Sequence, residues 1–203
     1  MCGRFVTGSD EHSWRSWSSI LRLTTEGVPT LSGEPFVPTA SVPIIRHIVD
    51  AKPDAPAASE LVWARWGLAP SWMKRPLQQR PQYNVRSETA PSKFKKYFTT
   101  RRCLLPASGF WIRRSPKGEY AYVSVPNSPL FGLAGLWTER ELDGETLRSC
   151  TILTTQAAPE LADLHERSPV ILLADQATRW LAPDCSLTEL STLCAGHVPL
   201  SVA

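Results

Sequence analysis

Proline constrains the fold of this 203-residue chain more than any other residue type. Its 18 prolines are scattered along the sequence, and each one removes a backbone donor and blocks the interior of a helix. The apolar segments between them are mostly short and end at turn-forming residues, a pattern typical of strands. We therefore expect an α+β fold, a single domain over residues 1–203 dominated by antiparallel strands and flanked by short helices.

Strands are expected wherever apolar residues alternate or cluster between turn residues. The expected strands are Cys2–Thr7, Val42–Val49, Leu61–Leu68, Arg102–Leu105, Phe110–Arg114, Tyr120–Val125, Leu130–Trp137, Leu147–Thr155 and Val170–Leu173. The expected helices are Asp10–Leu23 with Ser9 as its cap, Ser92–Phe98, Pro159–Leu164, Ala174–Leu181 and Leu187–Leu193. An exposed hairpin loop is expected over Asp50–Ser59 and a longer, proline-containing loop over Ala69–Gln82.

The cysteines indicate neither a disulfide framework nor a metal site. They number five, stand at the scattered positions 2, 103, 150, 185 and 194, and form no CxxC spacing. We expect free thiols in a reducing compartment, no metal and no cofactor. We find no secretory signal, and no apolar run approaches the ~20 residues that span a membrane. The expectation is a cytoplasmic protein with no membrane partner, and the net charge of +3 permits a polyanionic one.

Cys2 is the residue with the most distinctive chemistry. Removal of Met1 would give Cys2 a free α-amine beside its thiol, and such a 1,2-aminothiol condenses with an aldehyde to a five-membered thiazolidine. An α-amine has a pKa near ~7.8 against ~10.4 for lysine, so far more of it is unprotonated at neutral pH. The same thiol could act as an acyl-transfer nucleophile. The alternative is an ordinary small residue in a first strand.

Three further blocks are candidates for function. Trp66 and Trp72 bracket a Gly and a Pro at a strand end, which fits either an aromatic platform beside a nucleic-acid channel or a buried corner. Asn84 and Arg86 share one face of a short strand, where they could hold a substrate oxygen and a phosphate. A polar surface strand is the alternative there. His165 precedes an apolar strand and could be a general acid or base, although a lone histidine is more often structural.

The blocks MCGRF, WGLAPSW, NVRSETA, RCLLPASGF, GLAGLW, TILTT and LHERSPVIL occur in this order along the chain. In this the chain closely resembles the SOS-response-associated peptidase (SRAP) family of abasic-site-processing proteins, and the resemblance covers nearly its whole length. It implies a β-rich domain with barrel-like sheets and a positively charged groove. It also implies a partner, single-stranded DNA that contains an abasic site, and a monomeric, nucleoid-associated protein.

The resemblance also implies roles for single residues. Cys2 would capture the ring-opened sugar aldehyde as a thiazolidine cross-link, Asn84 would position the lesion or the cysteine amine, and His165 would help to open the sugar ring and shuttle protons. The residues expected to contact DNA are Arg4, Trp66, Trp72, Lys74, Arg75 and Arg86, of which Arg4 and Arg86 would hold flanking phosphates.

The chain departs from the family pattern at Ile112. After the Pro-Ala-x-Gly block the family usually has two aromatics, then glutamate, then tryptophan, whereas here the run is Gly109-Phe110-Trp111-Ile112-Arg113. Ile112 thus replaces a proton-transferring carboxylate. Glu119, across the expected hairpin, would face Arg114 and is a weak substitute. Two alternatives therefore stay open beside the cross-linker: an attenuated or non-catalytic binder of single-stranded or damaged DNA, and a thiol peptidase that uses Cys2 and His165.

Overall fold

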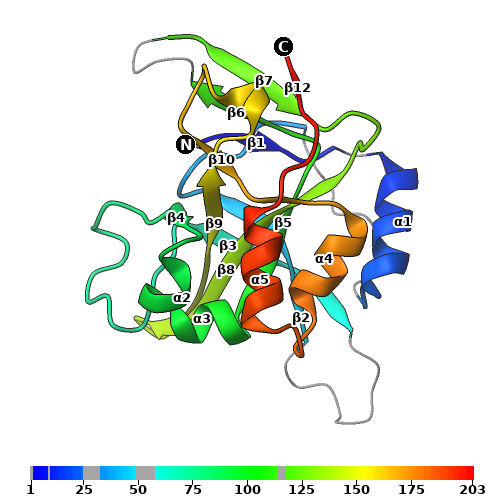
Figure 1. Ribbon diagram of the computed structural model, residues 1–203. Helices are drawn as coiled ribbons and strands as arrows, with labels where there is room; N and C mark the ends of the chain where they lie inside the picture. The colour runs from blue at the N-terminus through cyan, green and yellow to red at the C-terminus, as the bar shows by residue number, and fades with distance from the viewer. Residues whose placement is uncertain (1, 9, 25–32, 49–57, 114–117) are drawn as a thin grey trace.

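Five strands close into a barrel at the centre of the structure (Figure 1). This computed structural model describes residues 2–8, 10–24, 33–48, 58–113 and 118–203. The barrel strands are β2 (Ser41–His47), β3 (Ser59–Trp66), β5 (Arg102–Ala107), β8 (Phe131–Leu142) and β9 (Glu145–Gln156). They follow the order β9-β3-β2-β5-β8, and the pairing of β8 with β9 closes the ring. The expected β-rich α+β fold with barrel-like sheets is confirmed.

Most of these pairings are antiparallel, as predicted, but β9 also makes parallel ones. It pairs in parallel with β3 and with the short strand β4 (Asn84–Arg86). It pairs antiparallel with β10 (Arg167–Pro169), while β11 (Ile171–Leu172) pairs antiparallel with β8. Thr154 of β9 is the register partner of both Arg86 and Pro169, so two motifs far apart in sequence meet at one point of the barrel.

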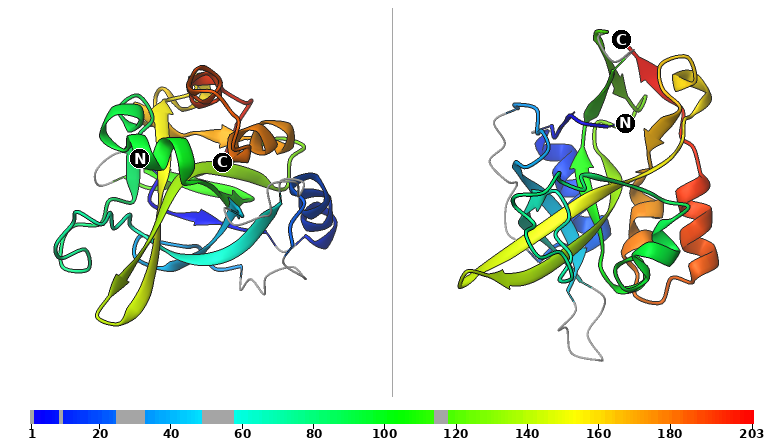
Figure 2. Two further views of the ribbon diagram at one scale, coloured as in Figure 1. Left: turned by 90° about the horizontal axis from the view of Figure 1, so that it is seen from below. Right: turned by 90° about the vertical axis from the view of Figure 1, so that its left-hand side faces the viewer.

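A second, smaller sheet lies over one end of the barrel (Figure 2, right). Its strands follow the order β1-β6-β7-β12, with the bounds β1 (Phe5–Val6), β6 (Gly109–Arg113), β7 (Tyr120–Ser124) and β12 (Ser201–Val202). Its inner face and the barrel enclose one of two hydrophobic clusters, and this cluster contains Cys2, Trp66 and Ile112. Cys2, three residues before β1, thus lies in the core between the two sheets.

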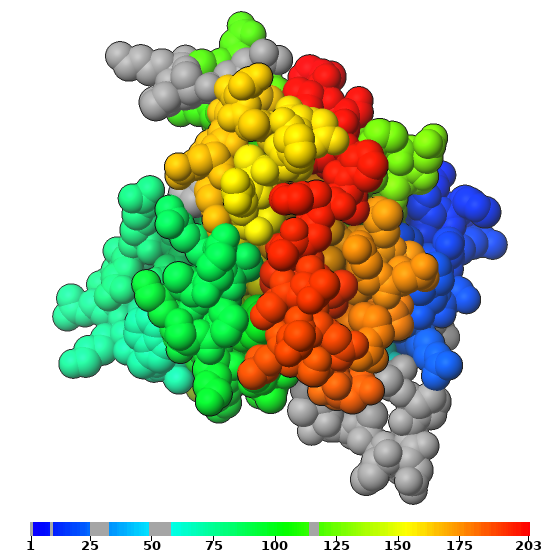
Figure 3. Space-filling view, in the orientation of Figure 1, coloured from blue at the N-terminus to red at the C-terminus, as the bar shows by residue number. Residues whose placement is uncertain are grey.

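Short α-helices cover one face and one flank of the barrel (Figure 1), and the residues of α4 and α5 form the orange and red surface of the space-filling view (Figure 3). They are α1 (Glu11–Leu21), α2 (Ala90–Lys93), α3 (Lys95–Thr100), α4 (Ala174–Leu181) and α5 (Leu187–Ala195). The 3-10 helix η1 (Pro159–Leu161) lies apart from them, with Leu161 in the cluster that contains Cys2. Between the five α-helices and the barrel lies the second hydrophobic cluster, which includes Trp14, Phe98 and Trp180. No helix among the described residues is long and apolar enough to cross a membrane.

Several helix boundaries differ from the predicted ones. Asp10, not Ser9, is the N-cap of α1, because its carboxylate accepts the Ser13 amide hydrogen at 2.8 Å. The single helix expected over Ser92–Phe98 is two helices that break at Phe94, whose φ of −126° is not helical. The expected pairing of Glu119 with Arg114 involves a residue outside the described ones.

Arg102 ties the helical layer to the barrel. Its guanidinium is buried and donates to the carbonyl oxygens of Trp180 and Ala182 at the end of α4, at 2.7 and 2.6 Å. It also donates to the Phe98 and Thr99 carbonyls of α3. The last carbonyls of a helix have no partner within that helix. One side chain of β5 therefore satisfies two helix ends.

Candidate functional site around Cys2

Cys2 lies at the edge of the core, with none of its surface exposed. Its Sγ contacts the carbonyl oxygen of Arg4 at 3.7 Å, in the distance range of a weak S–H donor. Burial raises the pKa of the Cys2 thiol to about 12, because a thiolate loses its hydration there. At neutral pH the resting residue is therefore a neutral thiol.

Asn84 holds the backbone of Cys2. Its Nδ2 donates to the Cys2 carbonyl oxygen at 2.7 Å, a contact between residues 82 positions apart. The parallel pairing of Asn84 with Ile152 fixes β4 against the barrel, so the amide is presented from a rigid strand. Its Oδ1 is buried and accepts no hydrogen bond from any described residue. A buried amide oxygen without a donor is costly, and it is an acceptor available to a ligand or to an amine.

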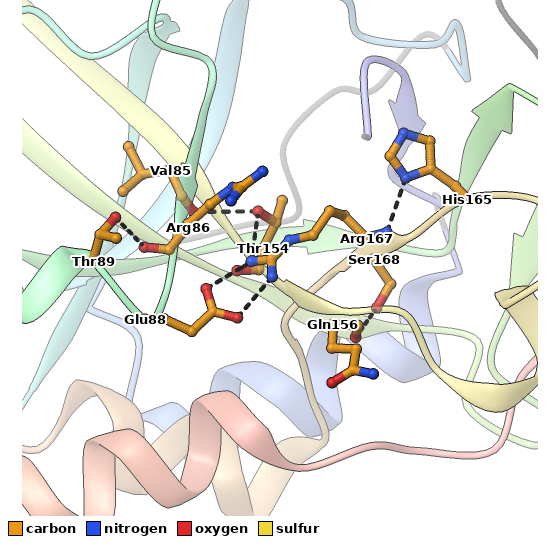
Figure 4. Close-up of polar contacts among 9 residues, drawn as sticks. All are labelled: Val85, Arg86, Glu88, Thr89, Thr154, Gln156, His165, Arg167 and Ser168. Carbon is orange, nitrogen blue, oxygen red and sulfur yellow. Dashed lines mark hydrogen bonds and ion pairs between the residues drawn. The ribbon is translucent and has the colours of Figure 1, made fainter.

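His165 follows η1 and is fixed through Nδ1. The backbone N–H of Arg167 donates to Nδ1 at 2.9 Å (Figure 4). Only an imidazole without a proton on Nδ1 can accept this bond, so the proton of the neutral ring is on Nε2. Burial is the largest cause that lowers the pKa of His165, and the positive charge at the chain's N-terminus is the second. His165 is thus a neutral imidazole near pH 7 that presents an N–H group at Nε2.

Arg167 connects the histidine segment to β4, a role the sequence did not reveal. Its Nη1 and Nη2 donate to the two carboxylate oxygens of Glu88 at 2.7 and 2.8 Å, and Nη2 also donates to the Thr154 carbonyl (Figure 4). Glu88 and Arg167 thus form a bidentate ion pair. The hydrogen bond to Arg167 is the largest cause that lowers the pKa of Glu88. The sequence feature that could have indicated this role is the position of Arg167, two residues after His165 in the HERSP block.

The expected DNA contacts are divided between surface and core. Arg86 is exposed and makes no ion pair among the described residues. Lys74, Arg75 and Trp72 are exposed on the loop between β3 and β4, and 61% of the Trp72 surface is accessible. The bridge between Leu68 and Gln82 closes the base of this loop two residues before Asn84.

The prediction that Trp66 contacts DNA is wrong. It has no exposed surface, its Nε1 donates to the Tyr83 carbonyl at 2.8 Å, and its ring meets the Phe5 ring edge-on at 5.2 Å. A side chain buried on all sides cannot contact DNA directly. Trp66 instead supports Phe5 and Tyr83, the neighbours of the Cys2 and Asn84 segments.

Ile112 is fully buried in the same hydrophobic cluster as Cys2. It pairs with Ala121 in the hairpin of β6 and β7, so Glu119 does not stand opposite to it. The residue at this position therefore supplies no proton and keeps the surroundings apolar. Among the described residues, no group of three His, Cys, Asp or Glu side chains could hold a metal ion.

Together, the fold and this geometry define a class: a β-barrel protein in which a strand asparagine holds a buried cysteine at the second position of the chain. The family model "SOS response associated peptidase (SRAP)" matches residues 1–199. The chain belongs to this family, and the resemblance noted from its motifs is confirmed.

Similar proteins support this assignment. The chain is 32% identical over 189 residues to abasic site processing protein YoqW of Bacillus subtilis, which covers 90% of this chain and 81% of that protein. It is 32% identical over 173 residues to abasic site processing protein HMCES of Xenopus tropicalis, with coverage of 71% and 52%. A crystal structure of a protein from Bordetella bronchiseptica, 24% identical, superposes with a TM-score of 0.77 and coverage of 100% and 98%. That likeness shows the shared fold.

Proposed function

We propose that this protein processes abasic sites in DNA by trapping the opened sugar of a single-stranded lesion on Cys2. The observation that carries the proposal is the 2.7 Å hydrogen bond from Asn84 Nδ2 to the Cys2 carbonyl oxygen. It fixes the backbone of the one residue that can become an aminothiol. The names of the relatives YoqW and HMCES, abasic site processing proteins, support the same lesion as the substrate.

The proposed reaction begins after removal of Met1. The α-amine of Cys2 attacks the C1′ aldehyde of the opened sugar, and loss of one water gives an imine. The thiol sulfur then adds to the imine carbon, and its proton moves to the nitrogen. One S–C and one C–N bond form, and the only molecule released is water. The linkage shields the lesion because the sugar no longer carries a free aldehyde.

The buried thiol favours this order of steps over a thiol peptidase. A peptidase of the cysteine–histidine type needs a thiolate, and its cysteine has a depressed pKa. Here burial raises the pKa of Cys2 to about 12. An α-amine, by contrast, is substantially unprotonated near neutral pH, with a pKa near ~7.8. The amine therefore reacts first, and the sulfur follows within the same residue.

The other residues have supporting roles in this proposal. Asn84 holds Cys2 through Nδ2 and offers Oδ1 to the amine or the sugar. His165, neutral and protonated on Nε2, donates to the sugar oxygen and carries protons between steps. Arg86 and Arg4 hold flanking phosphates, and Trp72 with Lys74 and Arg75 provides a second contact region on its loop.

A second candidate is an attenuated protein that binds the lesion with slow chemistry. The observation behind it is Ile112, fully buried where a carboxylate would transfer protons. A general acid or base typically contributes about 10²–10⁴ in rate. Cross-linking is therefore expected to be slowed rather than abolished, because the aminothiol itself does not depend on residue 112.

Intact-mass measurement of the purified protein, alone and after incubation with an abasic single-stranded oligonucleotide, tests the proposal. The protein alone should have the mass of the chain without Met1. After incubation, the adduct should have the summed mass of that protein and the oligonucleotide minus one water. Cys2→Ala should give no adduct. Cys185→Ala removes a cysteine outside the hydrophobic cluster that contains Cys2, and this variant should react like the wild type. An adduct formed by Cys2→Ala, or a wild type that keeps Met1 and forms none, would refute the trap.

A further inference from the structure

A cluster of two arginines and one tyrosine lies on the small sheet, beside the N-terminal segment that carries Cys2. The Arg4 guanidinium carbon is 4.8 Å from the centre of the Tyr120 ring, and that of Arg113 is 5.6 Å from it. Tyr120 is 45% exposed. Contacts of this length between a guanidinium and an aromatic ring are cation–π interactions. The ring therefore holds two positive charges close together at the surface, at the end of the molecule where β6 and β7 lie (Figure 1).

The strand alternation builds this cluster. In β6, Phe110 and Ile112 are buried, which directs Arg113 to the outer face. In β7, Ala121 and Val123 are buried, and Tyr120 is the register partner of Arg113. Arg4 reaches the same face because its carbonyl accepts the Trp111 amide hydrogen at 2.9 Å.

Among the described residues, no carboxylate neutralises either guanidinium. Arg4 and Arg113 make no ion pair with any described residue, whereas five other arginines of the chain do, namely Arg15, Arg46, Arg148, Arg167 and Arg179. Glu119 is exposed next to Tyr120 in sequence, and it forms no ion pair among the described residues either. Arg113 donates one long hydrogen bond, to the Gly118 carbonyl at 3.4 Å. The Tyr120 ring therefore holds two planar guanidinium groups in place, and their positive charge is available to bind an anion.

We infer that Arg113 and Arg4, held by Tyr120, form a binding site for a backbone phosphate of the single strand next to the lesion. The guanidinium fork matches a phosphate group and binds it through two donors. The site lies next to the reacting residue, because the Cys2 thiol contacts the carbonyl of Arg4. The inference rests on the proposed function for the identity of its ligand.

Salt-dependent binding of an undamaged single-stranded oligonucleotide tests the site without the covalent step. For single strands each neutralised phosphate contributes roughly 0.7 to the slope of log affinity against log salt. Arg113→Ala should lower the magnitude of this slope by about that amount. Between 50 and 200 mM salt, the ratio of wild-type affinity to variant affinity should therefore change by roughly a factor of three. Arg15→Ala, which removes an exposed arginine already paired with Glu11, is the matched control and should bind like the wild type.

Neutral phosphate analogues locate the contact. Methylphosphonates placed one at a time along an abasic oligonucleotide should weaken binding of the wild type at one position near the lesion, and that loss should vanish in Arg113→Ala. Tyr120→Phe keeps an aromatic ring and should bind normally, whereas Tyr120→Leu should bind more weakly. If Arg113→Ala and Arg15→Ala have equal slopes, or no methylphosphonate effect depends on Arg113, the phosphate site is refuted while wild-type binding and cross-linking still support the proposed function. Loss of wild-type binding itself would refute both.

Discussion

The side-chain amide of Asn84 donates to the backbone carbonyl of Cys2 at 2.7 Å, and it does so from a strand that is itself fixed in parallel pairing with β9. This bond fixes the carbonyl group of the residue whose amine and thiol would react. Positioning of a reacting group can account for a large part of a rate, and small displacements can cost about 10² in rate.

Replacing Asn84 should therefore slow cross-linking more than it weakens DNA binding. Asn84→Ala is expected to reduce the cross-linking rate by at least about tenfold, since Cys2 loses its donor. Asn127→Gly is a suitable control, because Asn127 lies in a turn at a φ of 58°, which glycine adopts freely. Rates on one abasic oligonucleotide, followed on denaturing gels, measure the effect. Equal rates for Asn84→Ala and the control would show that the bond has no part in the reaction.

Ile112→Glu should accelerate the reaction and destabilise the protein. The new carboxyl group would restore a proton-transfer residue, and a gain of at least about tenfold is expected. Because Ile112 is fully buried, the carboxyl group would lose its hydration, at a cost of about 1–3 kcal/mol in the free energy of unfolding. Ile112→Gln is the matched control, with similar size and no proton to transfer. If Ile112→Gln accelerates cross-linking equally, the low polarity of the site, and not the lack of a proton-transfer group, limits the rate of the wild type.

The lowered pKa of His165 predicts that the stability of the protein depends on pH, as does the rate of the reaction. Its pKa is lowered in the folded protein, so the unfolded chain binds a proton more readily than the folded one. The stability that the neutral imidazole confers is present above its unfolded pKa, near ~6.5, and is lost as the pH falls below it. The melting temperature of the wild type relative to His165→Gln should thus decrease from pH 7.5 to pH 5. A constant difference would mean that folding does not perturb the imidazole. At pH 7.5, His165→Ala should nearly abolish cross-linking.

Glu88 should act on the reaction through Arg167 and His165. The carboxylate fixes the Arg167 side chain, whose backbone N–H in turn holds His165 Nδ1. Glu88→Gln should slow cross-linking severalfold and leave the binding of undamaged DNA unchanged. Glu189→Gln is a comparison, since Glu189 also binds an arginine, Arg179, but on the helical face. A loss of rate in both variants alike would indicate general destabilisation.

The two tryptophans of the WGLAPSW block should behave in opposite ways. Trp66→Ala removes a fully buried ring and should lower the free energy of unfolding by about 3–5 kcal/mol. Trp72→Ala removes an exposed ring, so the melting temperature should hardly change, while affinity for single-stranded DNA should fall by the ~1–3 kcal/mol typical of base stacking. Thermal unfolding and fluorescence anisotropy separate the two effects. If Trp72→Ala binds DNA normally, the loop is not a contact region.

Local patterns predicted much of the secondary structure. The helix Ala174–Leu181 was predicted with its correct limits, because an amphipathic period within eight residues depends only on neighbours in sequence. The prediction for β8 ended at Trp137, whereas the strand continues to Leu142 and turns at Asp143 and Gly144, both at positive φ. An Asp-Gly pair is a strong hairpin signal that was available in the sequence.

The sequence by itself determined the family, the aminothiol chemistry open to Cys2, the candidate residues Asn84 and His165, and the departure at Ile112. These depend on residue identity and order. Only the tertiary structure decided that Asn84 meets Cys2, that Arg167 links Glu88 to His165, and that Trp66 is buried while Trp72 is exposed. The reason is physical: each of these contacts follows from closure of the barrel, which pairs strands many residues apart, and such pairing leaves no period in the local sequence.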